Sequence, residues 1–496
     1  MEFDVIVVGA GTAGCMAAAQ IARRTDLTIG VVEAGGRYPG WALHAPLAGL
    51  RLRRFWSWQH HTAPVAGLAN RSVTFPMGKV IGGTSAVNAM IAAAGHPQDY
   101  QFLTESKSTE VSIKRFQEDL TALGVQIQAP RHCSSFTKAF LQACHEEGLS
   151  RTDSLDGSLS ETCGTFRLFQ NHGCRWSAAH LLRDTRCRER IHVLRNTMAR
   201  KVMLHGTRAV GVETGSSLST GAIKARVGVL LAAGAIHTPC ILQRSGIGPK
   251  ALLESSGIRV VEDLPGVGQN FQDHVGVPWV VPSRVPAPGR PSRWLPAAIQ
   301  FMTCRNGIMT SNCCEAGCFL GEGGARPTIE VFTHFQTTKH PNAVEFSTVL
   351  LHPKSRGEVG LNPANPWGPP RIDPQYFSSG DDLSCLAEGL RRTIRIANSD
   401  ALLRYGLQDS DEDVAPDWIR RHAATHYHPA GTCLQGDDAL GVVTRGFQVH
   451  RTDALWVADM SVVPEVPGGH TATTALLIGA KAGFEIATNR GAGSNQ

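Results

Sequence analysis

The sequence predicts an α/β fold, and two segments near its start carry that prediction. Residues 3–8 are an apolar, β-branched run that breaks into the glycine-rich turn 9–14 and then an alanine-rich segment, in the order strand, turn, helix. A second apolar run, residues 28–32, ends in Glu33, near the spacing of about 20 residues at which dinucleotide-binding βαβ units place a carboxylate. With 496 residues, 42% of them hydrophobic, the chain is long enough for a large core and more than one domain.

The glycines of the first turn each have a physical role in binding a dinucleotide. Gly9 permits the tight turn, Gly11 lets the backbone approach a pyrophosphate, and Gly14 allows the helix to pack closely on the strand. The helix N-terminus faces the phosphates, and the carboxylate of Glu33 accepts hydrogen bonds from ribose hydroxyls. The residues expected to hold the ADP half of the cofactor are Gly9, Gly11, Thr12, Ala13, Gly14, Glu33 and Ala34. NAD and FAD share this half, so the fingerprint alone does not choose between them.

Three later segments carry further motifs. Residues 78–88 form a glycine-rich turn with hydroxyl and amide donors, suited to an extended, oxygen-rich cofactor. Residues 230–239 are typical of a buried strand that enters a second turn, and they continue into Ser-Gly-Ile-Gly-Pro at 245–249. Residues 264–274 add Leu-Pro-Gly-Val-Gly-Gln-Asn-Phe-Gln-Asp-His. With these motifs in order between Asp4 and about Ala487, the chain resembles the glucose-methanol-choline (GMC) oxidoreductase family.

The resemblance implies an α/β (α+β overall) protein with a Rossmann-like FAD-binding domain and an interleaved substrate domain built on an antiparallel sheet with helices. It implies FAD rather than a nicotinamide cofactor. Some family members carry a histidine that bonds covalently to FAD where this chain has Val87, so non-covalent FAD is expected. The further cofactor-binding residues that it implies are Gly78, Gly82, Gly83, Thr84, Asn88, Ala233, Gly234, Asp459, Met460, His470, Thr471 and Ala472.

The positions of the motifs divide the chain into interleaved domains. The FAD-binding domain is expected to comprise residues 1–40, 75–95, 190–275 and 425–496. The substrate-binding or cap domain, with connecting segments, is expected to comprise residues 41–74, 96–189 and 276–424. The proline-rich segment 278–296 is interpreted as a crossing between domains, and residues 345–351 as a strand of the substrate domain.

Two histidines beside glycines, His428 and His470, are the predicted catalytic pair. The predicted strand 454–459 lies between them, and such a path can bring both imidazoles to one side of a ring. The unperturbed pKa of histidine, about 6.5, suits it to take a hydroxyl proton near neutral pH. The family places its active-site pair at these positions, so His428 is expected to accept the proton while His470 holds the same oxygen and the carbon delivers hydride to flavin N5. The N-terminus of a helix predicted at 471–487 is expected to stabilise the reduced flavin.

Three other histidines have less definite roles. His426 either lines the substrate pocket or faces away from it, because alternate residues of an extended segment point in opposite directions. His237 and His274 are interpreted as structural histidines near the core of the cofactor domain.

The predicted function is FAD-dependent oxidation of an alcohol group to an aldehyde or ketone. The segment 99–120 lacks the tryptophan-rich lid expected of the family, and Leu434-Gln435 replaces its usual Arg-Met, so a more open site is expected. Small polyols, sugars and aminoglycoside-like primary alcohols of secondary metabolism are the candidate substrates. The alternatives are a lyase of the hydroxynitrile type, which keeps FAD without using it in redox chemistry, and a flavin-binding protein without chemistry of its own. The electron acceptor, whether oxygen, a quinone or a protein, is left open, as is oxidase against dehydrogenase.

Composition bears on partners and location. The net charge of +6 is scattered, and the densest basic group, residues 51–54 beside aromatic residues 55–58, is better interpreted as a loop over the cofactor cleft with its arginines in solvent than as a nucleic-acid site. No apolar run of 18 residues and no charged leader occur, which predicts a soluble, cytoplasmic protein without a membrane span. The 13 cysteines are expected to be reduced thiols, and no metal site is expected because their spacing matches no common zinc motif.

Overall fold

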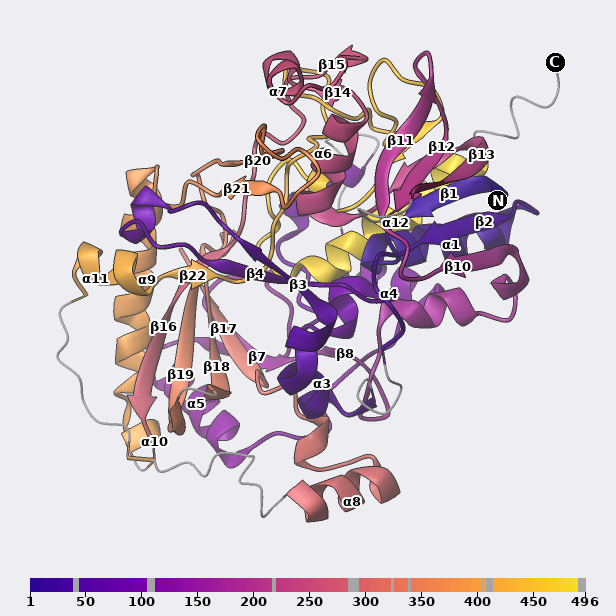
Figure 1. Cartoon of the computed structure of the whole chain (residues 1–496). Coiled ribbons are helices and arrows are strands. Elements are labelled where there is room, and N and C mark those ends of the chain that lie inside the picture. The colour runs from indigo at the N-terminus through magenta and orange to yellow at the C-terminus, as the bar shows by residue number, and fades with distance from the viewer. Residues whose placement is uncertain are drawn as a thin grey trace.

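Two seven-stranded sheets organise the part of the chain that the structure describes (Figure 1). The structure is a computed structural model, and the residues it describes are 1–38, 44–104, 112–215, 220–283, 294–322, 325–337, 340–403, 405–406 and 414–488. No helix within these ranges is long and apolar enough to cross a membrane.

The first sheet has the strand order β10-β2-β1-β13-β12-β11, and β23 also pairs with β13. The pairs β1/β2, β10/β2, β1/β13 and β13/β23 are parallel, whereas β12 is antiparallel to both of its neighbours. The strands are β1 Glu2–Val8, β2 Ile29–Val32, β10 Ile191–Leu194, β11 Ala199–His205, β12 Arg208–Gly215, β13 Thr220–Leu231 and β23 Leu455–Val457. Parallel strands end at one edge of a sheet, so the turns after β1, β2, β13 and β23 gather there. The Rossmann-like arrangement expected from the sequence is confirmed.

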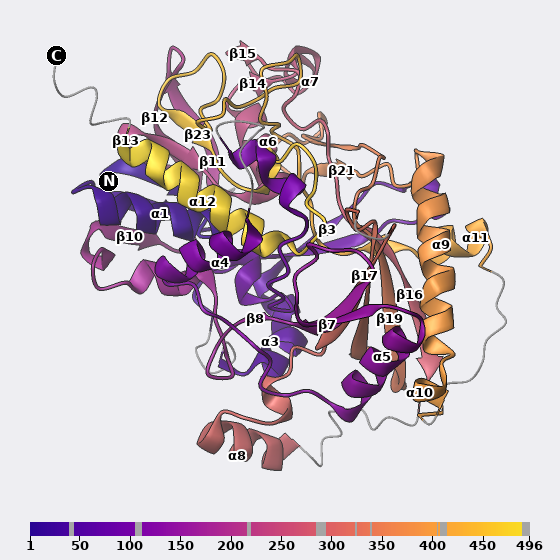
Figure 2. The same cartoon turned by 180° about the vertical axis from the view of Figure 1, so that it is seen from behind.

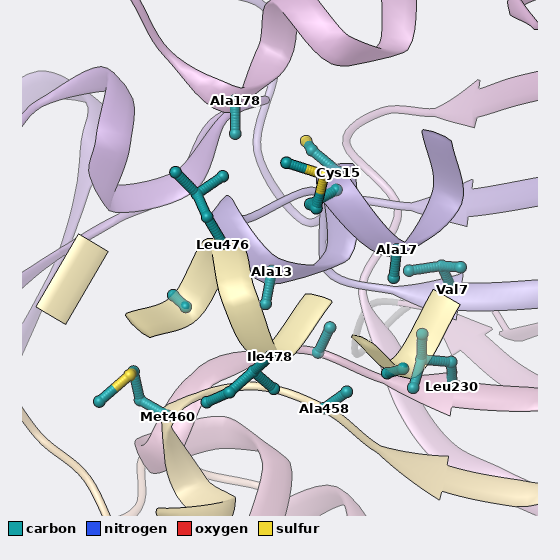
Figure 3. Close-up of a cluster of buried hydrophobic side chains, with 14 of the residues drawn as sticks. Val7, Ala13, Cys15, Ala17, Ala178, Leu230, Ala458, Met460, Leu476 and Ile478 are labelled. Carbon is teal, nitrogen blue, oxygen red and sulfur yellow. The ribbon is translucent and has the colours of Figure 1, made fainter. Parts of the chain in front are cut away.

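Helices α1 (Thr12–Arg24) and α12 (Thr471–Thr488) pack against each other beside this sheet (Figure 2). Their approach is close because α12 has glycines where it meets α1. A Cβ atom at Gly479 would lie 2.3 Å from the carbonyl oxygen of Ala13, and one at Gly483 would lie 2.8 Å from that of Ala17. Figure 3 shows Leu476 and Ile478 of α12 with Ala13 of α1 in this buried cluster. The two ends of the chain thereby form one core.

The second sheet has the order β22-β16-β19-β18-β17-β7-β6 and is antiparallel except for the pair β6/β7. Its strands are β6 Ser150–Leu155, β7 Thr162–Phe166, β16 Val275–Pro282, β17 Ala316–Leu320, β18 Ile329–Thr337, β19 His340–Leu350 and β22 Ala424–Thr425. Helix α9 (Gly380–Ala397) packs on it, and a Cβ atom at Gly389 would lie 2.8 Å from the side chain of Ile329 (Figure 1). This antiparallel sheet with helices is the one expected for the substrate domain.

The segment interpreted as a domain crossing, 278–296, is partly a strand. Its residues up to Pro282 belong to β16, which pairs with β19 along its whole length. Prolines are tolerated because the other neighbour, β22, pairs only with Val275 and Gly276, so no described strand pairs with the rest of this edge of β16 and no N–H is needed there. Residues 284–293 lie outside the described part of the chain.

Shorter elements connect these layers. The helices are α3 Pro46–Leu52, α4 Ile113–Ala122, α5 Ser135–Glu146, α6 Gly234–Arg244, α7 Lys250–Ser255, α8 Trp294–Cys304, α10 Asp400–Leu403 and α11 Pro416–His422. The strands are β3 Ser57–His61, β4 Thr74–Gly78, β5 Ile127–Gln128, β8 Leu168–Asn171, β9 Cys174–Arg175, β14 Ile247–Gly248, β15 Glu262–Asp263, β20 Glu358–Gly360 and β21 Arg371–Asp373.

Candidate active site

A cavity of about 1620 Å³ is lined by residues that belong to both sheets. At one end lie the turns after β1 and β2, and at the other lie side chains of β16, β18 and β19 with the segment 424–429. The volume exceeds the 300–1,000 Å³ of typical pockets for drug-sized ligands, so the cavity has room for a dinucleotide together with a substrate.

Most of the residues predicted to bind the cofactor line this cavity. They are Gly9, Gly11, Thr12, Ala13, Glu33, Ala34, Gly78, Gly83, Thr84, Asn88, Ala233, Gly234, Asp459, Met460, His470, Thr471 and Ala472. Gly14 and Gly82 are not in the lining. A Cβ atom at Gly14 would lie 2.0 Å from the carbonyl oxygen of Gly9, and the amide of Gly82 donates to the carbonyl of Ala10 at 2.7 Å. These two glycines therefore support the turns from behind.

The backbone of the glycine turns at Gly11 and Gly83 faces the cavity without side chains that cover it. Helix α1 begins after Gly11 without a side-chain cap, so its first amides remain available to an anion. A Cβ atom at Gly83 would lie 2.7 Å from the Cα of Gly11, which shows that the two glycine turns meet without side chains between them. An extended pyrophosphate fits such a cradle.

The side chain of Glu33 bonds the turns after β1 and β2 and also lines the cavity. Its Oε2 accepts from the amide of Ala10 at 2.9 Å and its Oε1 from the amide of Gly35 at 2.7 Å. Burial raises the pKa of this carboxyl, while the two amides act in the opposite direction. Each carboxylate oxygen has a further lone pair, so the group can still accept from ribose hydroxyls. The donors and acceptors at this end thus fit the ADP half of a dinucleotide such as FAD.

Asp459 ties the second glycine turn to the C-terminal segment. Its Oδ2 accepts from the amide of Gly234 at 2.8 Å and from the hydroxyl of Thr238 at 2.6 Å. Its Oδ1 accepts from the amide of Ser461 at 2.8 Å. This carboxylate fixes the cavity wall that carries Met460.

His428 and His470 lie side by side in the cavity lining. Their ring centroids are 5.3 Å apart and the rings are nearly perpendicular, at 85°. The amide of His470 donates to the carbonyl of Ala93 at 2.8 Å, and the residue directly precedes α12. The structure thus brings the two predicted catalytic histidines together.

His470 contacts a carboxylate that the sequence analysis missed. Its Nε2 lies 3.1 Å from Oε1 of Glu330, a residue of β18 that is only 2% exposed. Glu330, Phe332 and His334 alternate along β18 and all line the cavity. A charged residue within the apolar run Ile329–Phe332 was the available sequence signal, because a buried carboxylate needs a partner.

His428 is held by two adjacent residues, Asp273 and His274. The backbone amide of His428 donates to Oδ1 of Asp273 at 2.7 Å, and the hydroxyl of Tyr376 donates to Oδ2 at 2.5 Å. Burial raises the pKa of Asp273 to about 7. The Nδ1 atoms of His274 and His428 are 2.8 Å apart. Burial also lowers the pKa of His428 well below its usual value, so the ring is neutral near pH 7.

The other histidines are now placed. His426 lines the cavity with its ring 5.8 Å from that of Phe332, and burial lowers its pKa to about 3. His237 also lines the cavity, packed between Trp58 and His60, and burial lowers its pKa to about 3. His274 was interpreted as a structural histidine, but its ring also contacts His428, the predicted base.

The basic and aromatic segment also differs from the loop expected of it. Residues 53–56 form a short 3-10 helix after α3, and β3 follows. Arg53 lines the cavity with its guanidinium 5.5 Å from the centre of the Tyr427 ring, whereas Phe55 is 63% exposed. At least one arginine therefore faces the cavity and not solvent. Of the segment expected to lack the family's lid, residues 105–111 lie outside the described ranges.

Comparisons with known proteins agree with this geometry. Residues 3–276 and 353–479 match the N-terminal and C-terminal family models described as GMC oxidoreductase. The chain is 30% identical to an alcohol dehydrogenase [acceptor] from Pseudomonas putida, over 96% of this chain and 94% of that one. It is also 30% identical to an oxygen-dependent choline dehydrogenase from Brucella anthropi, over 98% and 96% of the two chains.

Solved structures have the same fold. A pyridoxine 4-oxidase from Mesorbium loti superposes with a TM-score of 0.84 at 25% identity, covering 97% of this chain and 98% of that one. A fungal aryl-alcohol oxidase superposes with a TM-score of 0.82 at 24% identity, covering 98% and 99%.

Proposed function

Because the chain belongs to the GMC oxidoreductase family, we propose that it oxidises a primary alcohol of a small polyol, sugar or aminoglycoside-like compound, with His428 as the base. Family membership makes the chain an FAD-dependent alcohol oxidoreductase. The observation that carries the proposal is the pairing of His428 with His470, ring centroids 5.3 Å apart, in the same cavity as the glycine turns of the cofactor site.

The protein side of the reaction needs a proton acceptor and a second group that positions the same oxygen. FAD, when bound, supplies the acceptor for the hydride that leaves the alcohol carbon. His428 is neutral, so it can take the hydroxyl proton as the carbonyl forms. His470, with its Nε2 against the carboxylate of Glu330, is held beside His428 with its Nδ1 left to hydrogen-bond the same oxygen.

Polar groups of β18 and β19 in the cavity lining suit a hydroxylated substrate. Ser347 donates to Oε1 of Glu345 at 3.0 Å, and both line the cavity beside His334 on the neighbouring strand. Trp279 and Phe332 give apolar surface in the same lining. A few polar groups in an otherwise apolar lining fix the orientation of a ligand, and these can pair with the hydroxyls of a sugar or polyol.

The remaining parts of the proposal concern the cofactor, the domains and the location. We propose that FAD is held without a covalent bond, because Val87 offers no nucleophile. Cytoplasmic location and the domain limits given above are also proposed. The proposed electron acceptor is oxygen, a quinone or a protein.

An anaerobic titration tests the function. The purified protein is mixed with a panel of primary alcohols, polyols and amino sugars while the visible absorption of the flavin is followed, and air is then admitted. Bleaching by one class supports the proposal and names the substrate class, and the speed of recovery in air separates an oxidase from a dehydrogenase. A flavin that no panel member bleaches contradicts it, and cyanohydrin cleavage is then assayed for the lyase.

A further inference from the structure

His274 touches the proposed base directly although it does not line the cavity. Its side chain is 1% exposed, and its Nδ1 is 2.8 Å from Nδ1 of His428, with the two rings nearly perpendicular at 82°. Nδ1 of His428 is occupied by this contact, so Nε2 is the ring nitrogen left for the substrate. Which of the two Nδ1 atoms carries the proton therefore decides whether His428 can act as a base.

The backbone fixes this contact from both sides. The segments 272–276 and 424–430 run antiparallel, with Gln272 and Ala430 exchanging two hydrogen bonds of 3.0 and 2.9 Å. The amide of His426 donates to the carbonyl of His274 at 2.9 Å, and Asp273 accepts from the amide of His428 at 2.7 Å. The adjacent residues Asp273 and His274 thus contact His428 at its backbone amide and at its ring.

One proton lies between the two Nδ1 atoms. Both rings are neutral, because burial lowers the pKa of His274 to about 3 and that of His428 well below its usual value. A base needs a bare Nε2, so the proton of His428 belongs on its Nδ1 and the Nδ1 of His274 must accept it. The proton of His274 then lies on its Nε2, which has no hydrogen-bond partner of normal geometry among the described residues.

The position of the proton on His274 fixes the position of the proton on His428. With its proton on Nε2, His274 presents a lone pair at Nδ1 and can only accept from His428. His428 then donates from Nδ1 and keeps a bare Nε2. We infer that His274 is a positioning residue that holds His428 in the tautomer whose free Nε2 can accept the hydroxyl proton. This inference rests on the proposed role of His428 as the base.

The first test reads the tautomers without any substrate. Long-range ¹H–¹⁵N correlation spectra of the flavin-loaded protein, labelled with ¹⁵N in its histidine rings, distinguish protonated from bare nitrogens. The signals of His428 and His274 are assigned by their loss in the H428A and H274F variants. The expected result is a protonated Nδ1 in His428 and a protonated Nε2 in His274. A His428 ring protonated on Nε2 in the native protein overturns the inference.

Two variants of His274 test the consequence for the reaction. H274F keeps a planar ring without an acceptor, whereas H274N places an amide oxygen near the position of Nδ1. With the panel alcohol that bleaches the native flavin, H274F is expected to reduce the flavin about a hundredfold more slowly, with substrate affinity little changed, and H274N is expected to recover most of that loss. Equal rates in H274F and H274N, whether both native or both low, contradict the inference.

The same experiment separates this inference from the proposed function. If H428A is slow and H274F is as fast as the native protein, His428 remains the base and only the role of His274 fails. If H428A is as fast as the native protein, the proposed function of His428 itself fails. If H274F does not retain flavin, the native tautomers measured by NMR decide the question alone.

Discussion

The two ends of the cavity are built differently. The cofactor end consists of backbone amides of glycine turns and the carboxylates of Glu33 and Asp459, and part of it comes from residues 9–34. The alcohol end, where the predicted catalytic pair lies, is lined by side chains from three separate segments, Glu330, His428 and His470, and His274 contacts His428 from outside the lining. We therefore expect flavin binding and proton transfer to depend on largely separate groups. Substitutions at one end should therefore change flavin retention, and those at the other should change the rate.

The largest expected effect is that of H428A. Loss of a general base typically costs 10²–10⁴ in rate, so flavin reduction should slow about 10³-fold while the flavin stays bound. Stopped-flow absorbance under anaerobic conditions measures the rate, and the ratio of flavin to protein absorbance measures retention. His205, exposed at the end of β11, gives the control variant H205A, which should react at the native rate. Loss of flavin in H428A would contradict the expectation that flavin binding and proton transfer depend on different ends of the cavity.

Acid should destabilise the alcohol end. The folded-state pKa of His426 is about 3, whereas an unfolded histidine titrates near 6.5. Its contribution to stability is therefore complete above pH 6.5 and is lost as the pH falls toward 3. The loss amounts to about 2 kcal/mol at about pH 5. Denaturant unfolding of the native protein, H426Q and H205Q, above pH 6.5 and again at about pH 5, measures this loss. H426Q should lose about 2 kcal/mol less than H205Q on acidification, and equal losses would contradict the burial argument.

E330Q tests the partner of His470. The substitution keeps the shape of the side chain and removes its charge, so the hydrogen bond at 3.1 Å loses its ionic part. Flavin reduction should slow about tenfold or more, because hydrogen bonds to charged groups contribute about 1.5–3 kcal/mol. Glu388, exposed on α9, provides the control E388Q. A native rate in E330Q with a slow H470A would show that His470 acts without its carboxylate.

The smallest expected effect is that of E33Q, at the cofactor end. A glutamine cannot accept from the amides of both Ala10 and Gly35, since one of its two terminal atoms is a donor. Affinity for FAD should fall roughly tenfold, as expected for one lost buried hydrogen bond. Dialysis followed by titration with FAD measures the affinity. Once reloaded, E33Q should reduce its flavin at the native rate, and a slow rate would again contradict the separation of the two ends.

Much of the cofactor end could be predicted because its determinants are local. The run 3–14 specifies strand, turn and helix within one short stretch, and Gly14 has no room for a side chain in that turn. Glu33 directly follows β2, so parallel pairing with β1 brings it to the same edge. The pair His428 and His470 was also predicted from the sequence, because each lies in a motif that resembles one of the family.

The contacts around that pair depend on registers that no local pattern contains. Glu330 reaches His470 because β18 occupies one particular position between β17 and β19, and His274 reaches His428 because two antiparallel segments align at Gln272 and Ala430. A shift by one residue would turn either side chain to the opposite face. The amino-acid sequence thus contains the cofactor turns, the family motifs and the predicted catalytic pair. Only the folded structure shows which buried groups contact that pair, because hydrogen bonds between distant segments exist only once both sheets have packed.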